Sequence, residues 1–216
     1  MSAKLLNNFF FQTSKIILQD IGCKIRPGSL KNLMDTLFIL CEKIGTNFSC
    51  FWHYYLNLYQ HLVDTEIKMA QITSKDTILI IGCGSLPATC VLLAQKINTT
   101  IVGIDHDEKA IRDAQHLIKK KKLQKKITLK CAKGDQFSLD DYDCVFVLYG
   151  VKNHAKVLKH ISETIKNDAR IIYRKPQNMQ DDLSVQNQNL LGLFHIKKIV
   201  HSTQFQGLDS YLLIKK

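Results

Sequence analysis

A short run of aliphatic, largely β-branched residues that ends in a glycine-rich turn constrains this chain more than any other feature. The run Thr77–Ile81 is followed directly by Gly82-Cys83-Gly84-Ser85, and a segment expected to be helical comes next. Glycines allow a tight turn and let the backbone approach a ligand closely. Amides at the start of a helix offer hydrogen bonds to a carboxylate or a ribose. The pattern therefore predicts a buried central strand, a ligand-binding turn and a helix, the first unit of an α/β fold.

Strand and helix patterns alternate along the following residues. The expected strands cover residues 77–81, 99–104, 127–131, 143–148, 170–174, 195–201 and 210–214, and the expected helices cover residues 86–96, 107–121, 152–166 and 181–191. Such alternation predicts a mostly parallel sheet with right-handed crossovers. The final two strands have no helix between them, which predicts an antiparallel last strand. The expected fold class is a Rossmann-like α/β domain.

Acidic residues follow the second and third expected strands. Asp105 ends the second strand and Asp135 comes just after the third, so both belong to the sheet edge where open α/β folds bind ligands. An acid in the place of Asp105 can accept the ribose hydroxyls of a nucleoside, and one in the place of Asp135 can accept from an adenine amine. The third glycine of the dinucleotide fingerprint is missing, with Pro87 nearby instead. This difference favours a nucleoside without phosphates over NAD or FAD.

We therefore expect this edge to bind S-adenosylmethionine (SAM), in the class I methyltransferase variant of the Rossmann-like fold. The candidate cofactor-binding residues are Gly82, Cys83, Gly84, Ser85, Pro87, Asp105, His106, Asp135, Gln136 and Tyr149. For Asp135 a second interpretation stays open, because Lys-Gly-Asp is also good turn chemistry.

The first 70 residues are expected to be all-helical, with helices over residues 29–44 and 49–70. We interpret residues 1–72 as a helical cap and residues 73–216 as the SAM-binding domain. Tyr55, Tyr59 and Glu66 share one face of the second helix, at 4- and 7-residue spacing. They are either a packed aromatic stripe with a solvated glutamate or part of the site.

Cysteine usage and charge limit the other function classes. The seven cysteines include no C-x-x-C pair and the histidines show no ligand spacing, so we expect free thiols, no metal and a cytoplasmic location. No apolar run is long enough to cross a membrane, and the N-terminus does not read as a signal peptide.

The net charge is +11, and six lysines lie between Lys119 and Lys126. This run fits a solvated helix end, with RNA or an anionic substrate as alternative partners.

Three segments resemble the nicotianamine synthases and their bacterial metallophore-forming relatives. Tyr59-Gln-His-Leu62-Val-Asp-Thr-Glu66 is similar to the family's Asn-Tyr-x-x-Leu-x-x-x-Glu stretch. The turn and the helix after it, Gly82–Ala94, resemble G-x-G-x-L/M-P-L-T-x-I-x-L-A, and Leu86-Pro87-Ala-Thr89 is the most specific point. Residues 169–174 resemble the penultimate core strand. The resemblance extends over residues 30–216.

The resemblance implies transfer of the 3-amino-3-carboxypropyl group of SAM to a small amino-acid or opine-like acceptor in metallophore biosynthesis. It implies catalytic roles for Tyr59 and Glu66. A further glutamate of the family falls on Gly45 here, with Glu42 three positions away as a candidate. Arg174 is a candidate on its own account, because an arginine at a strand end can pair bidentately with a substrate carboxylate.

Other activities stay open at this point. The departure at Gly45 leaves room for a single transfer, for methylation of a small molecule, or for SAM binding without catalysis. Val147–Gly150 stands where enzymes that methylate base amino groups carry an Asn/Asp-Pro-Pro-aromatic motif, so that chemistry is not expected. A basic RNA-binding module is the alternative of another class, and the sequence also leaves a homodimer open.

Overall fold

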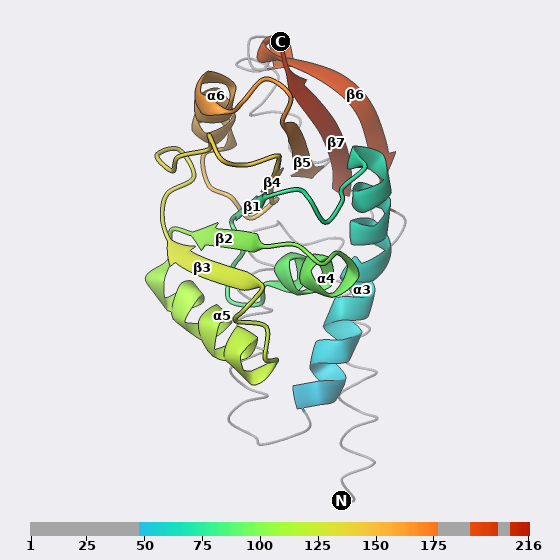
Figure 1. Cartoon of the computed structure of the whole chain (residues 1–216), viewed down its shortest axis with the longest axis vertical. Coiled ribbons are helices and arrows are strands. Elements are labelled where there is room, and N and C mark those ends of the chain that lie inside the picture. Colours follow the sequence, from blue (N-terminus) through green and yellow to red (C-terminus); the bar gives the residue numbers. More distant parts are fainter. Residues whose placement is uncertain (1–47, 177–190, 203–207) are drawn as a thin grey trace, which may run out of the picture.

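The computed structural model describes residues 48–176, 191–202 and 208–216, which form one seven-stranded sheet with helices on both faces (Figure 1). Within these ranges the strands are β1 (Ile78–Ile81), β2 (Ile101–Asp105), β3 (Ile127–Cys131), β4 (Cys144–Val147), β5 (Arg170–Pro176), β6 (Phe194–His201) and β7 (Leu208–Lys215). The helices are α3 (Phe48–Ala70), α4 (Ala88–Lys96), α5 (Glu108–Lys120) and α6 (His154–Thr164), with a 3-10 turn η2 at Leu191–Leu193.

The sheet has the order β3-β2-β1-β4-β5-β7-β6. Neighbouring strands from β3 to β5 are parallel, whereas β7 is antiparallel to both β5 and β6. This arrangement confirms the expected mostly parallel sheet with an antiparallel last strand. It also brings the carboxyl ends of β1, β2, β4 and β5 to one edge, which is where the glycine turn begins.

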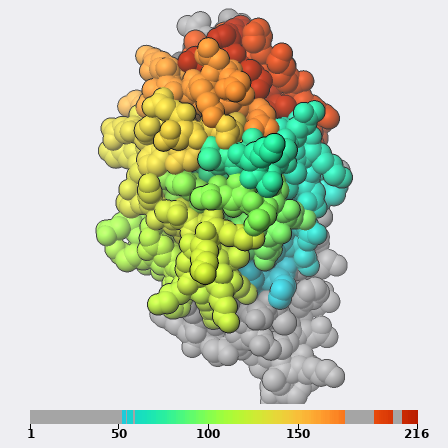
Figure 2. Space-filling model, in the orientation of Figure 1, coloured from blue at the N-terminus to red at the C-terminus, as the bar shows by residue number. Residues whose placement is uncertain are grey.

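The central strands are apolar throughout because helices cover both faces of the sheet. Every residue of β1 and β4 is buried. Ile78 and Ile80 belong to a core cluster with α3, α4 and α5, whereas Leu79 and Ile81 belong to a second cluster with α6. Alternate residues of a strand point to opposite faces, so a continuous aliphatic run supplies both cores. In the space-filling view α6 and the two C-terminal strands close one end of the described body, away from α5 (Figure 2).

Helix α3 lies on the same face of the sheet as α4 and α5 and shares a core cluster with them. It packs on α4 and on β5 and β7 (Figure 1). Its buried residues Trp52, Leu62 and Val63 lie in the same cluster as Ile80 of β1. The expected helix over residues 49–70 is confirmed. Residues 1–47, with the expected helix over 29–44, lie outside the described residues, so the domain boundary at residue 72 stays a prediction.

The lysine run begins in the last turn of helix α5, at Lys119 and Lys120. Asp107 caps the helix by accepting from the amides of Lys109 at 2.9 Å and Ala110 at 3.3 Å. Downstream of this helix the lysines begin to contact the protein itself: the ammonium of Lys121 lies 5.7 Å from the Trp52 ring centroid, and Lys126 donates to the carbonyl of Ala94. Part of the basic run therefore has partners within the chain.

The expected helix over residues 181–191 lies almost entirely outside the described ranges, and only its last residue falls in η2.

In the part of the chain that the structure describes, no helix combines the length and apolar character needed to cross a membrane.

Strand β2 passes close beneath α4, and we predict that the fold depends on Gly103 there. A Cβ at this position would lie 2.7 Å from Leu129 Cδ2 and 3.2 Å from Cys90 Sγ. Gly103→Ala should therefore lower the free energy of unfolding by about 1–3 kcal/mol through overpacking, measured by urea denaturation. Gly150→Ala is the matched control, because no atom lies within 4 Å of its added Cβ. Equal losses in the two variants would contradict the close approach.

Candidate functional site

The turn after β1 requires glycine at two positions. Gly82 and Gly84 have φ angles of 82° and 67°, in the left-handed region that other residues rarely adopt. A Cβ on Gly82 would lie 2.6 Å from Val151 Cγ2. The amides of Gly82 and Cys83 both donate to the carbonyl of Ile104, at 2.8 and 3.0 Å. The turn is thus held against the end of β2, and the Val151 side chain packs where a side chain on Gly82 would lie.

Asp105 ties this turn to the start of the next helix. One carboxylate oxygen accepts from the Gly84 amide at 2.9 Å, and the other accepts from the Asp107 amide at 3.0 Å and lies 3.1 Å from His106 Nδ1. Asp105 is buried, whereas His106 is exposed. A carboxylate offers about four lone-pair sites. Three of them are engaged by the chain itself, and Asp105 is buried beneath the turn, outside the pocket lining.

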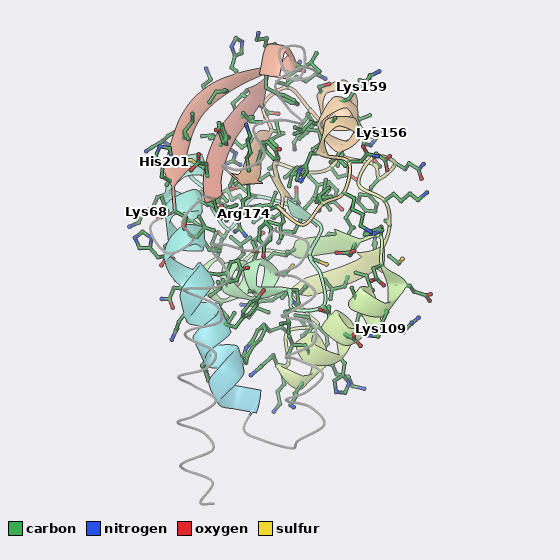
Figure 3. All side chains as sticks on the ribbon, turned by 180° about the vertical axis from the view of Figure 1, so that it is seen from behind. Lys68, Lys109, Lys156, Lys159, Arg174 and His201 are labelled. Carbon is green, nitrogen blue, oxygen red and sulfur yellow. The ribbon has the colours of Figure 1, made fainter. Side chains whose placement is uncertain are left out.

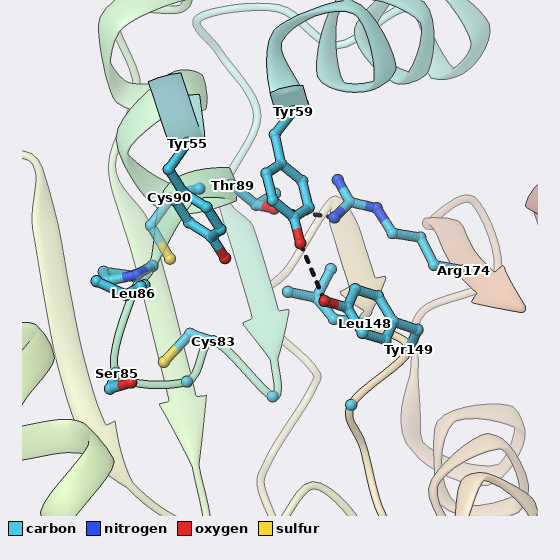
Figure 4. Close-up of a pocket in the computed structure, with 15 residues that line it drawn as sticks. Tyr55, Tyr59, Cys83, Ser85, Leu86, Thr89, Cys90, Leu148, Tyr149 and Arg174 are labelled. Carbon is cyan, nitrogen blue, oxygen red and sulfur yellow. Dashed lines mark hydrogen bonds between the residues drawn. The ribbon is translucent and has the colours of Figure 1, made fainter. Parts of the chain in front are cut away.

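A pocket opens between the turn and helix α3, with about 610 Å³ of empty space that includes open solvent (Figure 4). Helix α3 lines it with Tyr55 and Tyr59, and the loop after β4 and strand β5 contribute Tyr149 and Arg174. The other lining residues are Gly82, Cys83, Gly84, Ser85, Leu86, Pro87, Ala88, Thr89, Cys90, Leu148 and Gly150. The structure thus brings a large part of the predicted site together, although its members are as far apart in sequence as Tyr59 and Arg174.

Two tyrosine hydroxyls meet in the pocket. The hydroxyl oxygens of Tyr59 and Tyr149 are 2.9 Å apart, and the Tyr55 ring lies edge-on to Tyr59 with centroids 5.0 Å apart (Figure 4). Burial, followed by the nearby Tyr55, raises the pKa of Tyr59 well above its ordinary value. Tyr59 is therefore a neutral phenol at physiological pH, able both to donate and to accept a hydrogen bond.

Arg174 and Glu66 form a buried ion pair. Arg174 donates from Nε to Glu66 Oε1 at 2.8 Å and from Nη2 to Glu66 Oε2 at 2.7 Å. Both residues have 0% exposure. The expected bidentate partner of Arg174 is therefore a residue of the chain itself rather than a substrate carboxylate at that edge. Glu66 is neither solvated nor at the surface of the pocket.

Tyr173 and Arg174 are neighbours in strand β5, but their side chains point to opposite faces of the sheet. The strand extends to Pro176, and adjacent residues point to opposite faces of the sheet. Tyr173 lies in the cluster with α6, where its ring centroid is 5.4 Å from that of His154. Of these two residues, only Arg174 lines the pocket.

Four predicted cofactor residues lie outside the pocket lining: Asp105, His106, Asp135 and Gln136. Asp135 and Gln136 belong to a turn after β3, and His106 is at the surface. The turn is held close to the sheet, because a Cβ on Gly134 would lie 2.5 Å from Ile81 Cγ2. A contact of Asp135 with adenine and a purely structural role in the turn both stay predictions. Glu42 lies outside the described residues.

Sequence reasoning did not single out two further polar partners. Arg174 Nη1 donates to Thr89 Oγ1 at 3.0 Å, and Ser210 donates to Glu66 Oε1 at 2.7 Å. Thr89 lies within the Leu86-Pro87-Ala-Thr89 motif after the glycines, so the motif could have identified it as a candidate. Ser210 follows Glu66 by 144 residues, and its pattern in β7 resembles any buried strand serine. Among the described residues, no group of three or more His, Cys, Asp or Glu could hold a metal ion.

Comparison with known proteins gives a family and two kinds of relative. A family model described as nicotianamine synthase protein matches residues 45–215. The L-histidine 2-aminobutanoyltransferase of Yersinia pestis is 32% identical over 73 residues, 34% of this chain and 28% of that protein. The protein of the same name from Pseudomonas aeruginosa (strain UCBPP-PA14) is 21% identical over 158 residues, 73% of this chain and 60% of that protein. The chain thus spans less than two thirds of the length of these curated relatives.

Solved structures show the same fold at low identity. A mutant of MtNAS in complex with S-adenosylmethionine superposes with a TM-score of 0.69 at 16% identity, covering 95% of this chain and 83% of that one. An RNA methyltransferase from Salinibacter ruber in complex with S-adenosyl-L-homocysteine gives a TM-score of 0.56 at 13% identity, covering 73% and 92%. These likenesses show the methyltransferase-type Rossmann-like fold that the sequence predicts.

The two oxygens of Asp105 accept from different amides, and this predicts an unequal effect of two neighbouring substitutions. Asp105→Asn leaves one of the two amides without its acceptor, which should cost about 1–3 kcal/mol of unfolding free energy. Asp107→Asn is the control, because asparagine caps a helix as well as aspartate does. Urea denaturation of both variants measures the difference. A loss in Asp107→Asn as large as that in Asp105→Asn would contradict the anchoring role of Asp105.

Proposed function

The chain belongs to the nicotianamine synthase family, and on this premise we propose that it binds SAM and transfers the 3-amino-3-carboxypropyl group to the amine of a small amino-acid acceptor. The observation that carries the proposal is the pocket in which Tyr59 of helix α3 faces the glycine turn. Two relatives are named for the transfer of an aminobutanoyl group to L-histidine. Histidine is therefore the first acceptor to test.

The residues at the turn fit a nucleoside with an amino-acid tail. Gly82 and Gly84 line the pocket just before helix α4, and Asp105 holds this turn by accepting from the Gly84 amide. We assign the turn and Asp105 to the cofactor, and Tyr59 and Tyr149 to the acceptor side.

When bound, SAM supplies a carbon made electrophilic by the adjoining sulfonium. The new N–C bond forms as a C–S bond breaks, and the leaving group is neutral 5′-methylthioadenosine. The acceptor amine must be neutral when it attacks and must release a proton after it attacks. The protein's part is to hold the neutral amine in line with the carbon, and the proton of the ammonium formed by the attack passes to solvent water.

We assign the positioning of the amine to the pair of tyrosine hydroxyls. Because the pKa of Tyr59 is raised by burial, its neutral phenol can accept a hydrogen bond from the amine, while its oxygen stays hydrogen-bonded to Tyr149, 2.9 Å away. Glu66 is not available as the base here, since its carboxylate accepts from both Arg174 and Ser210. Orientation by a neutral phenol is therefore the chemistry that the geometry supports best.

We also propose a cytoplasmic location. The described cysteines Cys83, Cys90, Cys131 and Cys144 are all free thiols, as is usual in a reducing compartment. Alkylation of the protein in freshly lysed cells, followed by peptide mass spectrometry, would test whether these thiols are reduced in the cell.

Incubation with SAM and L-histidine should release 5′-methylthioadenosine, identified by mass spectrometry. Tyr59→Phe should lower kcat by about a hundredfold, because the attacking amine is no longer held in line with the carbon. Tyr142→Phe, which is outside the pocket lining, is the matched control and should keep the wild-type rate. Release of S-adenosylhomocysteine alone would replace this proposal with methyl transfer. No nucleoside release together with RNA binding that falls steeply with salt would favour the basic module instead.

Calorimetry of SAM binding tests the cofactor assignment separately from turnover. We expect Asp105→Asn to weaken binding by about tenfold or more, because a hydrogen bond to a charged acceptor contributes about 1.5–3 kcal/mol. Asp107→Asn should bind as the wild type does. Equal affinity in all three proteins would show that Asp105 does not contact the cofactor.

A further inference from the structure

Four elements of the fold meet at one buried polar cluster. Glu66 comes from α3, Arg174 from β5, Thr89 from α4 and Ser210 from β7, and all four are at most 4% exposed. Their hydrogen bonds are between 2.7 and 3.0 Å long. A buried charge is tolerated only when it is paired and hydrogen-bonded, so each of these elements is fixed relative to the others by the needs of one guanidinium and one carboxylate.

The cluster lies directly behind Tyr59. The guanidinium carbon of Arg174 is 5.9 Å from the centroid of the Tyr59 ring, so the cation faces the ring (Figure 4). Figure 3 shows Arg174 inside the body, whereas Lys109, Lys156 and Lys159 extend from its surface. Although burial lowers it, the Glu66 carboxylate holds the pKa of Arg174 above its ordinary value, so the residue stays charged.

Helical geometry links the same cluster to the direction of the Tyr59 side chain. Tyr59 and Glu66 are seven residues apart on α3 and lie on one face, about 10.5 Å apart along the axis. A bidentate bond at Glu66 sets the rotation of the helix about its own axis. That rotation decides whether the Tyr59 hydroxyl reaches Tyr149 above the glycine turn.

We propose that Glu66 and Arg174 are positioning residues that act through Tyr59, and that neither binds the substrate or takes its proton. The inference rests on the proposed function only in giving Tyr59 a role in the reaction. The Nε–Nη2 edge of Arg174 belongs to Glu66, and its Nη1 holds Thr89 in the first turn of α4. Arg174 thereby sets the distance between the tyrosine and the turn that precedes α4.

The test separates positioning from simple stabilisation. Glu66→Met and Arg174→Met each leave one buried charge without its partner and should destabilise the protein. The double variant E66M/R174M removes both charges, and such apolar replacement of a buried pair often restores stability. Arg170→Met is the matched control: Arg170 is on the same strand, forms an ion pair with Asp76 and donates to the carbonyl of Ala70 at 2.9 Å, so its loss also leaves a carboxylate without its partner. It is outside the pocket lining.

In the double variant we expect the urea midpoint to return close to that of the wild type while kcat stays about tenfold to a hundredfold lower, as for a misplaced catalytic group. KM for the acceptor should change little. In the Tyr59→Phe background, the same two substitutions should add almost no further loss of kcat, since residues that act as a unit are not additive. Recovery of kcat together with stability, full additivity with Tyr59→Phe, or a loss confined to KM would each overturn the proposal.

A spectroscopic measurement decides the same question without turnover. The chain has one tryptophan, Trp52. Its ring centroid lies 6.1 Å from that of Tyr55, and the Tyr55 centroid lies 5.0 Å from that of Tyr59. Displacement of Tyr59 should therefore shift the emission of Trp52 in E66M/R174M and leave it unchanged in Arg170→Met. Unchanged emission in both would refute the positioning role. If the wild-type protein releases no 5′-methylthioadenosine with any acceptor, the proposed function fails and the emission of Trp52 still decides this inference.

Discussion

The buried ion pair between Glu66 and Arg174 is the contact on which the relation of helix α3 to the sheet depends. Both groups lose their water on folding, so the fold is stable only if each meets the other in good geometry. The two parallel hydrogen bonds of 2.7 and 2.8 Å satisfy this condition. Apolar contacts alone allow a helix to slide or rotate on a sheet at small cost, whereas a bidentate bond tolerates little of either. The tyrosine on the same face of α3 is thereby given a defined direction.

The opposite wall of the pocket depends on backbone geometry rather than on charge pairing. Two glycines with positive φ form the turn after β1, and Asp105 of β2 holds that turn by the Gly84 amide. The parallel pairing of β1 with both β2 and β4 brings their carboxyl ends to one edge. The pocket therefore lies between a rigid turn that is suited to a nucleoside and a helix that presents neutral tyrosines, which is consistent with transfer from a sulfonium to an amine.

Neutral hydroxyls suit this chemistry better than a free carboxylate does. A carboxylate in the pocket would attract the sulfonium and hold an acceptor amine in its protonated form, in which the amine is not a nucleophile. In this protein the one glutamate that shares a helix face with Tyr59 is neutralised by Arg174, and burial keeps the tyrosine protonated. The described part of the site therefore combines hydrogen-bonding capacity with little net charge, which suits the proposed transfer.

The sequence by itself determined the order and type of the described strands and helices, because aliphatic runs, glycine breaks and helical spacing are local signals. It also identified the glycine turn, Asp105, Tyr59 and Arg174 as candidates, since each belongs to a motif or a strand end. It did not reveal what Arg174 does. An arginine at a strand end has the same local pattern whether it meets solvent, a substrate or Glu66, which precedes it by 108 residues. Only the tertiary structure decided that choice, because burial and the identity of a long-range partner arise when distant segments pack together.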